Sequence, residues 1–250
     1  MVKVLFFDAP YFGKVELAKK TLEYILKKKY KIIALYASVQ FCNQLDVVKK
    51  QLEAAGIAWV TSKADRTHVT SQVLGCDNYH SSLNLKAQAD AYLYVGDGKF
   101  HPLALVYGQK DLSKDEVKEI ICNDPIEKKF ELLDILHIKT ILKKYKGSLL
   151  KFLNATTVGV LITVKPGQEQ MKPSFYLEKK FPNKKFYYFL DNVVSFDQLE
   201  NFPFVKVWVN TTCPRVGFDD QLKFEKGVIN LNDALEAEAI LGKDSAMNGL

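Results

Sequence analysis

Arginine and cysteine are scarce in this chain. Its 250 residues include 35 basic side chains, of which only Arg66 and Arg215 are arginines, and 4 cysteines. Because lysine supplies the positive charge elsewhere, a retained arginine indicates a need for the planar guanidinium, which binds a carboxylate or phosphate at two points. The alternative is chance survival in a lysine-biased sequence. Arg215, two residues after Cys213, is the stronger functional candidate of the two.

The sequence also lacks a long hydrophobic run and a secretion signal. No apolar run reaches the ~18 residues of a membrane span, so no membrane association is expected. The N-terminal MVKVLFFDAP contains Asp8 and predicts a first β-strand rather than a signal peptide. Four separated cysteines in such a chain indicate a reducing, cytoplasmic compartment without disulfides. The thiols are then packing residues, reactive groups or metal ligands.

Several catalytic and nucleic-acid motifs are absent. The chain has no GxSxG, HExxH or P-loop, which leaves hydrolase and nucleoside-triphosphatase functions without support. It has no arginine-rich tract or RNA-binding signature, so direct binding of nucleic acid is not expected. The net charge of +6 comes from lysines along the expected helices. They form a solvated helix face or, alternatively, attract an acidic partner.

The order of expected elements predicts an α/β protein. Apolar strands alternate with amphipathic helices, which is typical of parallel sheets covered by helices on both faces. We predict two similar units, residues 1–124 and 154–250, joined by a long helix over 125–153. Asp124 is a good N-cap and Pro125 fits the first helical position.

The cysteines follow strands. Cys42, Cys122 and Cys213 come at or just after the end of an expected strand, and Cys76 lies in the loop after one. Ligands of open parallel sheets bind beyond the carboxyl ends of the strands, so these thiols can converge on a crevice between the units. The polar turns LGCDN and TTCPR favour Cys76 and Cys213 as ligands or reactive thiols. Cys122 has the context of a core residue, and Cys42 stays open.

Local spacing does not identify a metal. There is no CxxC, so zinc or an iron–sulfur cluster is only weakly indicated by the cysteines alone. His101, after GDGKF, is either an active-site donor or a loop residue. Gln168, in KPGQ, is either an amide donor to a ligand or part of a surface turn.

Taken in order, several segments resemble one family. The matching pieces are SVQFCNQLDVVKKQLEAAGI, QVLGCDNY, DAYLYVGDGKFHPLAL, ICNDP, GVLITVKPGQ and VWVNTTCPRVGFDD, which cover roughly residues 30–222. The chain resembles the diphthamide synthesis family of 2-(3-amino-3-carboxypropyl)histidine synthases, of the archaeal Dph2 type. The ordered set VLGC, GKFHPL, KPGQ and NTxCPR is fairly specific, although each motif alone would be weak.

The resemblance implies an iron–sulfur transferase with radical chemistry. Family members bind a [4Fe-4S] cluster through three cysteines, one from each of three α/β domains, and cleave S-adenosylmethionine. They transfer its 3-amino-3-carboxypropyl group to a histidine of elongation factor 2, the first step of diphthamide biosynthesis. Cys76 and Cys213 match the second and third cluster ligands. Arg215 and Gln168 match positions that bind the methionine moiety, and His101 lies in a family motif near the site.

The chain departs from the family in one respect. The family's first domain, with its first cysteine, is missing, so a second chain, a homodimer, Cys42 or Cys122 must supply the third ligand if a cluster forms. The resemblance therefore implies an enzyme component that needs a partner. The alternative is a cluster-free subunit that binds elongation factor 2 or a catalytic partner, and zinc on the same thiols is a third possibility.

Overall fold

The computed structural model describes residues 9–75, 77, 80–84, 89–109, 117–165, 170–218 and 224–245. The strand expected at the N-terminus lies mostly outside these ranges. The described residues divide into two compact units, with the boundary between Ile135 and Leu136.

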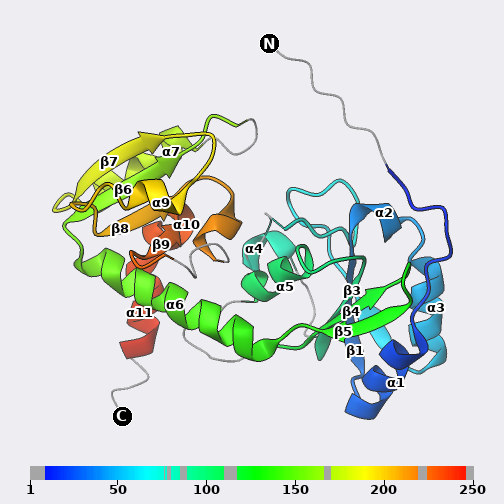
Figure 1. Cartoon of the computed structure of the whole chain (residues 1–250). Helices are drawn as coiled ribbons and strands as arrows, with labels where there is room; N and C mark the ends of the chain where they lie inside the picture. Colours follow the sequence, from blue (N-terminus) through cyan, green and yellow to red (C-terminus); the bar gives the residue numbers. More distant parts are fainter. Residues whose placement is uncertain are drawn as a thin grey trace. The chain divides into compact units, whose positions relative to one another are not determined.

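Unit 1 is built on a five-stranded sheet (Figure 1). Its strand order is β2-β1-β3-β4-β5, and the first four strands are parallel while β5 is antiparallel to β4. Strands β1 and β3 are almost wholly apolar and buried, as expected for strands with helices on both faces. The bounds are β1 Ile32–Ala37, β2 Ala58–Val60, β3 Ala91–Val95, β4 Ile120–Asp124 and β5 Lys129–Leu132.

Among the described residues of unit 1, five helices accompany this sheet. Helices α1 and α3 are amphipathic and bury Ile25, Val48 and Leu52 in one core cluster with β1 and β3. Gly56 follows α3 with a positive φ of 72°, a conformation that glycine adopts readily where helices end. The bounds are α1 Lys19–Lys28, α2 Val39–Cys42, α3 Asp46–Ala54, α4 His80–Leu83 and α5 Pro102–Gly108.

Unit 2 repeats the topology of unit 1. Its four strands are all parallel in the order β7-β6-β8-β9, so the second strand along the chain lies at one edge, beside the first. The first four strands of unit 1 have the same order, and the prediction of two similar parallel-sheet units is confirmed. The bounds are β6 Thr157–Ile162, β7 Lys185–Leu190, β8 Val207–Asn210 and β9 Val228–Asn230.

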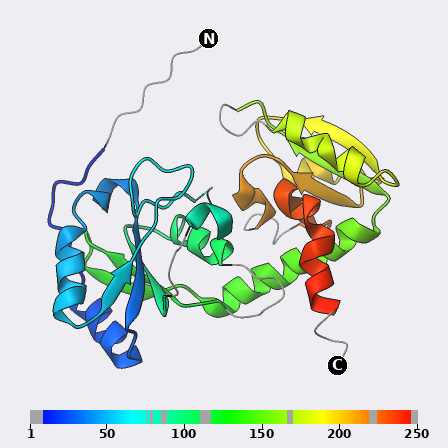
Figure 2. The ribbon, with the colours of Figure 1, turned by 180° about the vertical axis from the view of Figure 1, so that it is seen from behind.

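Helices cover both faces of the second sheet. In Figure 1, α9 lies in front of the sheet, and in Figure 2 the viewer sees α7, α8 and α10 on the opposite face. The long α6 packs on that opposite face, where Phe152 contacts Phe181 and Tyr145 donates a hydrogen bond to Asp233. The bounds are α6 Ile135–Asn154, α7 Met171–Ser174, α8 Tyr176–Lys180, α9 Phe196–Leu199, the 3₁₀ helix η1 Pro214–Gly217, α10 Leu231–Leu235 and α11 Ala237–Ser245.

The long helix begins later than predicted. Residues 125–128 form a turn and Lys129–Leu132 form β5, so the helix starts at Ile135 instead of residue 125. The Oδ1 atom of Asp124 does accept backbone hydrogen bonds, from Ile126 and Glu127 at 2.8 and 3.0 Å, but these close a turn instead of capping a helix. A good N-cap residue is also a good turn residue, and pairing of β5 with β4 decided between the two.

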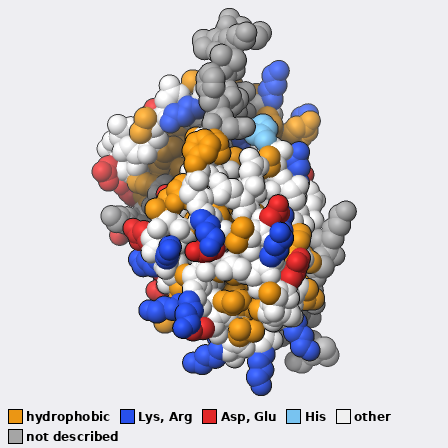
Figure 3. All heavy atoms as spheres, turned by 90° about the vertical axis from the view of Figure 1, so that its right-hand side faces the viewer, with side chains coloured by type: hydrophobic (Ala, Val, Ile, Leu, Met, Phe, Trp, Pro, Cys, Tyr) orange, Lys and Arg blue, Asp and Glu red, His pale blue; other side chains and the backbone are white. Residues whose placement is uncertain are grey.

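The described surface is mixed in charge. On the face in Figure 3, lysine and arginine side chains are scattered among acidic and uncharged ones, which agrees with solvated helix faces. None of the described helices combines the length and apolarity that crossing a membrane requires.

Candidate functional site

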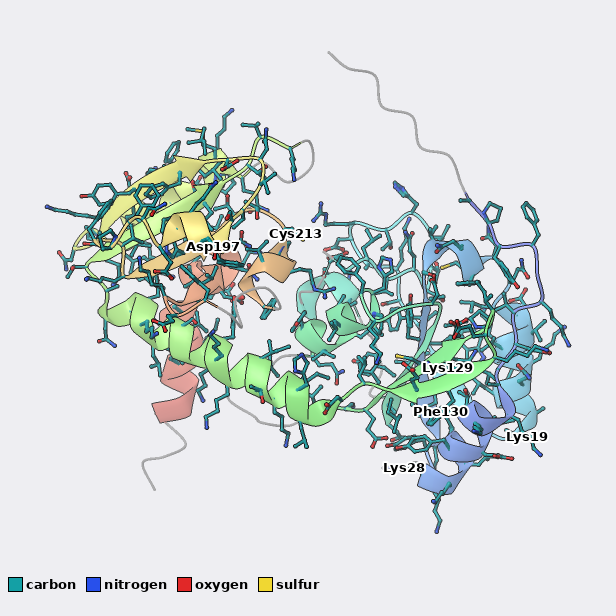
Figure 4. All side chains as sticks on the ribbon, in the orientation of Figure 1. Lys19, Lys28, Lys129, Phe130, Asp197 and Cys213 are labelled. Carbon is teal, nitrogen blue, oxygen red and sulfur yellow. The ribbon has the colours of Figure 1, made fainter. Side chains whose placement is uncertain are left out.

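Cys213 lies in a short loop at the carboxyl end of β8. It directly precedes η1, and its side chain is half-buried (Figure 4). Its backbone is extended, with φ −61° and ψ 124°, and its carbonyl oxygen accepts a hydrogen bond from the Val216 backbone at 3.0 Å. The loop therefore has a defined conformation, and it leaves the thiol partly accessible.

Two buried asparagines hold this loop from below. Asn210 ends β8 and Asn230 ends the neighbouring β9. The Nδ2 of Asn210 donates a hydrogen bond to the Oδ1 of Asn230 at 2.8 Å. The Nδ2 of Asn210 also donates to the Cys213 carbonyl at 2.9 Å, and the Nδ2 of Asn230 donates to the Pro214 carbonyl at 3.0 Å. The Oδ1 of Asn210 accepts from the backbone and hydroxyl of Thr212. The backbone of Thr212, Cys213 and Pro214 is thus hydrogen-bonded to the ends of β8 and β9.

The asparagine pair is itself fixed by α6 and η1. The backbone N–H of Asn230 donates to the Tyr145 hydroxyl at 2.9 Å, and the ring of Tyr145 stacks on Phe218 with centroids 4.3 Å apart. Gly217 sits so close to Asn230 that an added Cβ would lie 2.4 Å from its Oδ1. Only glycine allows η1 to approach the pair at this distance.

Arg215 lies within η1, and the residue is 8% exposed. A guanidinium remains charged at all accessible pH values, and a buried charge is costly unless it has partners. By contrast, Arg66 is exposed. The role of Arg215 in binding a ligand stays a prediction.

Cys76 and Gln168 lie outside the described residues, but both chain neighbours of Cys76 are described. The segment before it lies against the carboxyl end of β1, where the backbone of Val73 donates to the Ala37 carbonyl at 3.0 Å. The Asp77 backbone donates to the Leu74 carbonyl at 3.0 Å. The segment before Cys76 is therefore hydrogen-bonded to the carboxyl end of β1, and ligands of parallel sheets bind beyond the carboxyl ends of the strands.

His101 contacts this loop directly. Its Nδ1 accepts a hydrogen bond from the backbone N–H of Gly75, the residue before Cys76, at 3.2 Å. Because Nδ1 is the acceptor, the proton of the neutral ring is on Nε2. Phe100 covers Gly75 so closely that an added Cβ would lie 2.2 Å from its ring. The motif GKFHPL therefore packs against the motif VLGC, which gives His101 a position beside the loop.

Cys42 and Cys122 are the two other described cysteines. Burial raises the pKa of each thiol from its ordinary 9.0 to about 12. Cys42 donates from Sγ to the Ser38 carbonyl at 3.4 Å, and Cys122 is a buried residue of β4. The core assignment of Cys122 is confirmed, whereas Cys42 is half-buried and packs against the core cluster of unit 1.

The described residues of unit 1 and of unit 2 form no metal centre. Those residues contain no group of three or more His, Cys, Asp or Glu side chains placed to hold a metal ion. The described cysteines are free thiols. Convergence of Cys76 and Cys213 on one crevice stays a prediction.

Sequence reasoning missed the asparagine pair. Both residues end short apolar strands, VWVN and VIN, and an asparagine that terminates a buried strand was the available signal. The signal is weak because asparagine is also a common turn residue. The pairing of β8 with β9 in register, with Asn210 opposite Asn230, is what brings the two amides together.

Comparison with known proteins supports the resemblance. Residues 2–248 match the family model described as "Putative diphthamide synthesis protein". The chain is 29% identical over 238 residues to the 2-(3-amino-3-carboxypropyl)histidine synthase of Pyrococcus horikoshii, covering 93% of this chain and 64% of that protein. The enzyme of the same name from Methanocaldococcus jannaschii is 28% identical over 146 residues, which cover 56% of this chain and 40% of that protein.

Solved structures agree with the sequence comparison. A crystal structure of Dph2 from Pyrococcus horikoshii with a 4Fe-4S cluster has a TM-score of 0.68 and 27% identity, and the match covers 94% of this chain and 65% of that one. A second crystal structure of the same protein has a TM-score of 0.68 and 26% identity, and covers 92% and 64%. The chain spans about 64% of the length of the first curated relative. It belongs to the diphthamide synthesis protein family.

Proposed function

We propose that this chain is a component of a 2-(3-amino-3-carboxypropyl)histidine synthase. Its reaction is transfer of the 3-amino-3-carboxypropyl group of S-adenosylmethionine to a histidine of elongation factor 2. The proposal is supported by family membership and by the relatives that carry this enzyme's name. Its single strongest structural support is the Cys213 loop, in which a half-buried thiol precedes a buried arginine on a loop fixed by two asparagines.

The chain has cysteine side chains of the kind that bind a [4Fe-4S] cluster. Cys213 and Cys76 would each supply one thiolate, and the hydrogen bonds around both loops limit their movement. When bound, such a cluster supplies a Lewis-acidic iron and an electron for cleaving the bond between the sulfonium sulfur and the aminocarboxypropyl group. Arg215 would bind the substrate carboxylate at two points, and Gln168 would donate an amide hydrogen bond to the methionine moiety.

The third cluster ligand comes from another chain in this proposal. Cys42 is half-buried and Cys122 is buried, and burial raises the pKa of both thiols to about 12, whereas a ligand must become a thiolate. One candidate is a separate protein that carries the family's first domain. A second copy of this chain is the other candidate.

Anaerobic reconstitution with iron and sulfide tests the proposal. The chain is reconstituted alone and with a candidate protein that carries the missing domain, and iron, sulfide and visible absorption are measured. We expect about four irons per site in the complex, loss of iron in Cys76→Ser and Cys213→Ser, and full retention in the matched control Cys42→Ser. Transfer of radiolabel from carboxyl-labelled S-adenosylmethionine to elongation factor 2 is then measured on the same samples.

Two results would reject this role. If no sample gains iron above the level of Cys213→Ser, the chain holds no cluster. If both cysteine variants fold and still support transfer to elongation factor 2, the chain is a cluster-free subunit that binds the factor or its catalytic partner. A colourless metal present in equal amount to the chain identifies zinc on the same thiols.

A further inference from the structure

A cavity of about 220 Å³ lies in unit 2, between the carboxyl ends of β6 and β7 and the helix α9. Most of its walls are apolar, and the rings of Phe189 and Phe202 lie 4.6 Å apart in it. Pockets that enclose a whole drug-sized ligand measure roughly 300–1,000 Å³, so this cavity has the size for one flat part of a ligand. The apolar walls include Leu161, Ile162, Phe189, Leu199 and Phe202.

Three polar side chains line the same cavity: Asp191, Ser195 and Gln198. One carboxylate oxygen of Asp191 accepts a hydrogen bond from the backbone of Val193 at 3.1 Å. Ser195 precedes α9 but makes no side-chain cap bond. Within the part of the chain that the structure describes, the other oxygen of Asp191 and the amide of Gln198 have no hydrogen-bond partner. Apolar walls with a few available polar groups are typical of small-ligand sites.

Asp191 has the position of a ribose-binding acid. It directly follows β7, the second strand of its unit, and its backbone N–H donates to the carbonyl of Ile162, at the end of β6, at 2.9 Å. It also comes 23 residues after Gln168, in the loop that follows β6. In nucleotide-binding parallel sheets, an acid about 20 residues beyond the first strand-to-helix loop hydrogen-bonds the ribose 2′-hydroxyl. The position of Asp191 therefore predicts a contact with a ribose.

The equivalent position of unit 1 lacks this acid. β2 occupies the place of β7 in the shared strand order, and Thr61 follows its last residue, Val60. The hydroxyl of Thr61 donates to the Oγ of Ser71 at 2.9 Å. The carboxylate at the end of β7 is therefore a specific feature of unit 2 and not a consequence of the repeated topology.

The cavity lies next to the strand that leads to Cys213. The carbonyl of Leu161, a wall residue, accepts hydrogen bonds from the backbone N–H and the hydroxyl of Thr211, at 3.1 and 2.7 Å. Thr211 precedes Cys213 by two residues. Because β6 pairs with both β7 and β8, the carboxyl ends of β7 and β8 are about 10 Å apart. A ligand of modest length can therefore extend from the cavity to the Cys213 loop.

We propose that this cavity binds the adenosine part of S-adenosylmethionine. The inference rests on the proposed function and extends it to residues outside the cysteine and arginine loops. Asp191 accepts hydrogen bonds from the ribose hydroxyls, and the amide of Gln198 pairs with N6 and N7 of the adenine. The apolar and aromatic walls contact the flat base. Since S-adenosylmethionine has no phosphate, the site needs no glycine-rich phosphate loop.

Binding of 5′-methylthioadenosine to the chain alone tests the proposal, because this compound is what S-adenosylmethionine becomes after losing the aminocarboxypropyl group. We expect NMR shifts at the amides of Asp191, Val193 and Ser195. The 2′-deoxy analogue should bind about tenfold more weakly to the wild type. Asp191→Asn should bind the two compounds within about threefold of each other. Asp197→Asn, the same change on exposed α9 (Figure 4), is the matched control and should keep the preference.

A second pair of variants tests the cavity itself. Val194→Trp fills the cavity from its wall and should abolish binding. Leu150→Trp, at an exposed position of α6, is the control and should leave binding unchanged. Gln198→Leu removes the amide and should weaken binding about tenfold. Circular dichroism on each variant verifies folding, and if Val194→Trp does not fold, the conservative Asp191→Asn decides.

Two results would overturn the proposal. The first is the absence of shifts at the cavity amides with about 5 mM 5′-methylthioadenosine, or shifts confined to other amides. The second is a folded Asp191→Asn that keeps the full preference for the 2′-hydroxyl. Both are independent of the iron measurements. Iron binding and group transfer without these shifts would reject the cavity and leave the proposed function, whereas these shifts in a chain that gains no iron would do the reverse.

Discussion

Asn210 and Asn230 form a buried amide pair beneath Cys213, with the Nδ2 of Asn210 2.8 Å from the Oδ1 of Asn230. Each also donates to a carbonyl of the loop above, Asn210 to Cys213 and Asn230 to Pro214. The conformation of the cysteine loop is therefore dictated by two neighbouring strand ends. A loop held in this way keeps its thiol in one position before any ligand binds.

Removing one amide should destabilise unit 2. Asn230→Ala leaves the Pro214 carbonyl and one donor of Asn210 buried without partners, at about 1–3 kcal/mol for each group. We expect the free energy of unfolding in urea to fall by about that much, and alkylation of Cys213 to become faster. Asn201→Ala, at an exposed position, is the control and should change stability by less than about 0.5 kcal/mol. Equal unfolding curves for the two variants would contradict the role of the pair.

The contact between His101 and Gly75 should restrain the loop that leads to Cys76. His101→Ala removes the acceptor of the Gly75 N–H, so hydrogen exchange at that amide should accelerate by roughly tenfold or more. Exchange measured by NMR or mass spectrometry verifies this. His137→Ala, on an exposed position of α6, should leave the Gly75 amide unaffected. An unchanged rate in His101→Ala would show that other contacts fix the loop.

The raised pKa values of Cys42 and Cys122 should make the protein less stable in alkali. The pKa of Cys42 and that of Cys122 rise from 9.0 in the exposed state to about 12 on folding, because burial disfavours the thiolate. The unfolded chain then binds fewer protons than the folded one between these values. Stability is therefore full below pH 9 and declines as pH rises toward 12, by about 1 kcal/mol per pH unit for each thiol.

Urea unfolding between about pH 8 and pH 10 measures this slope. The variant Cys42→Ser/Cys122→Ala has no buried thiols and should show a flatter dependence over this range. Buried tyrosines such as Tyr92, whose pKa is raised from 10.0 to about 12, add to the decline as pH approaches 10, but they do so equally in both proteins. Parallel slopes in the two proteins would contradict the assignment of the thiols to the core.

Substrate binding should depend on the guanidinium of Arg215 and should not depend on that of Arg66. If Arg215 binds the substrate carboxylate, Arg215→Lys loses the two-point contact and should raise the KM for S-adenosylmethionine about tenfold or more. The iron content of the complex should stay unchanged. Arg66→Lys, at an exposed position, is the matched control for the same chemical change. Equal KM values for the two variants, with both folded, would remove Arg215 from substrate binding.

The sequence predicted much of this architecture because strand periodicity is local. Alternation of apolar strands with amphipathic helices was enough to predict two units built on parallel sheets. The prediction failed at residues 125–132, where Asp124 and Pro125 suit both a turn and a helix start. Only the hydrogen bonds between β4 and β5 distinguish these alternatives.

For the candidate site, too, some features follow from the sequence and others only from the tertiary structure. By itself, the sequence determined the residue types and their order: Cys213 before Arg215, VLGC before GKFHPL, and a family pattern spread over the chain. Tertiary structure alone decided that His101 holds Gly75 and that Asn210 and Asn230 meet beneath Cys213. It also decided that Cys42, which the sequence left open, is a half-buried thiol that donates to the Ser38 carbonyl. The physical reason is that the contacts of His101 and of the asparagine pair join residues 20 to 85 positions apart, and only strand pairing and helix packing bring such residues together.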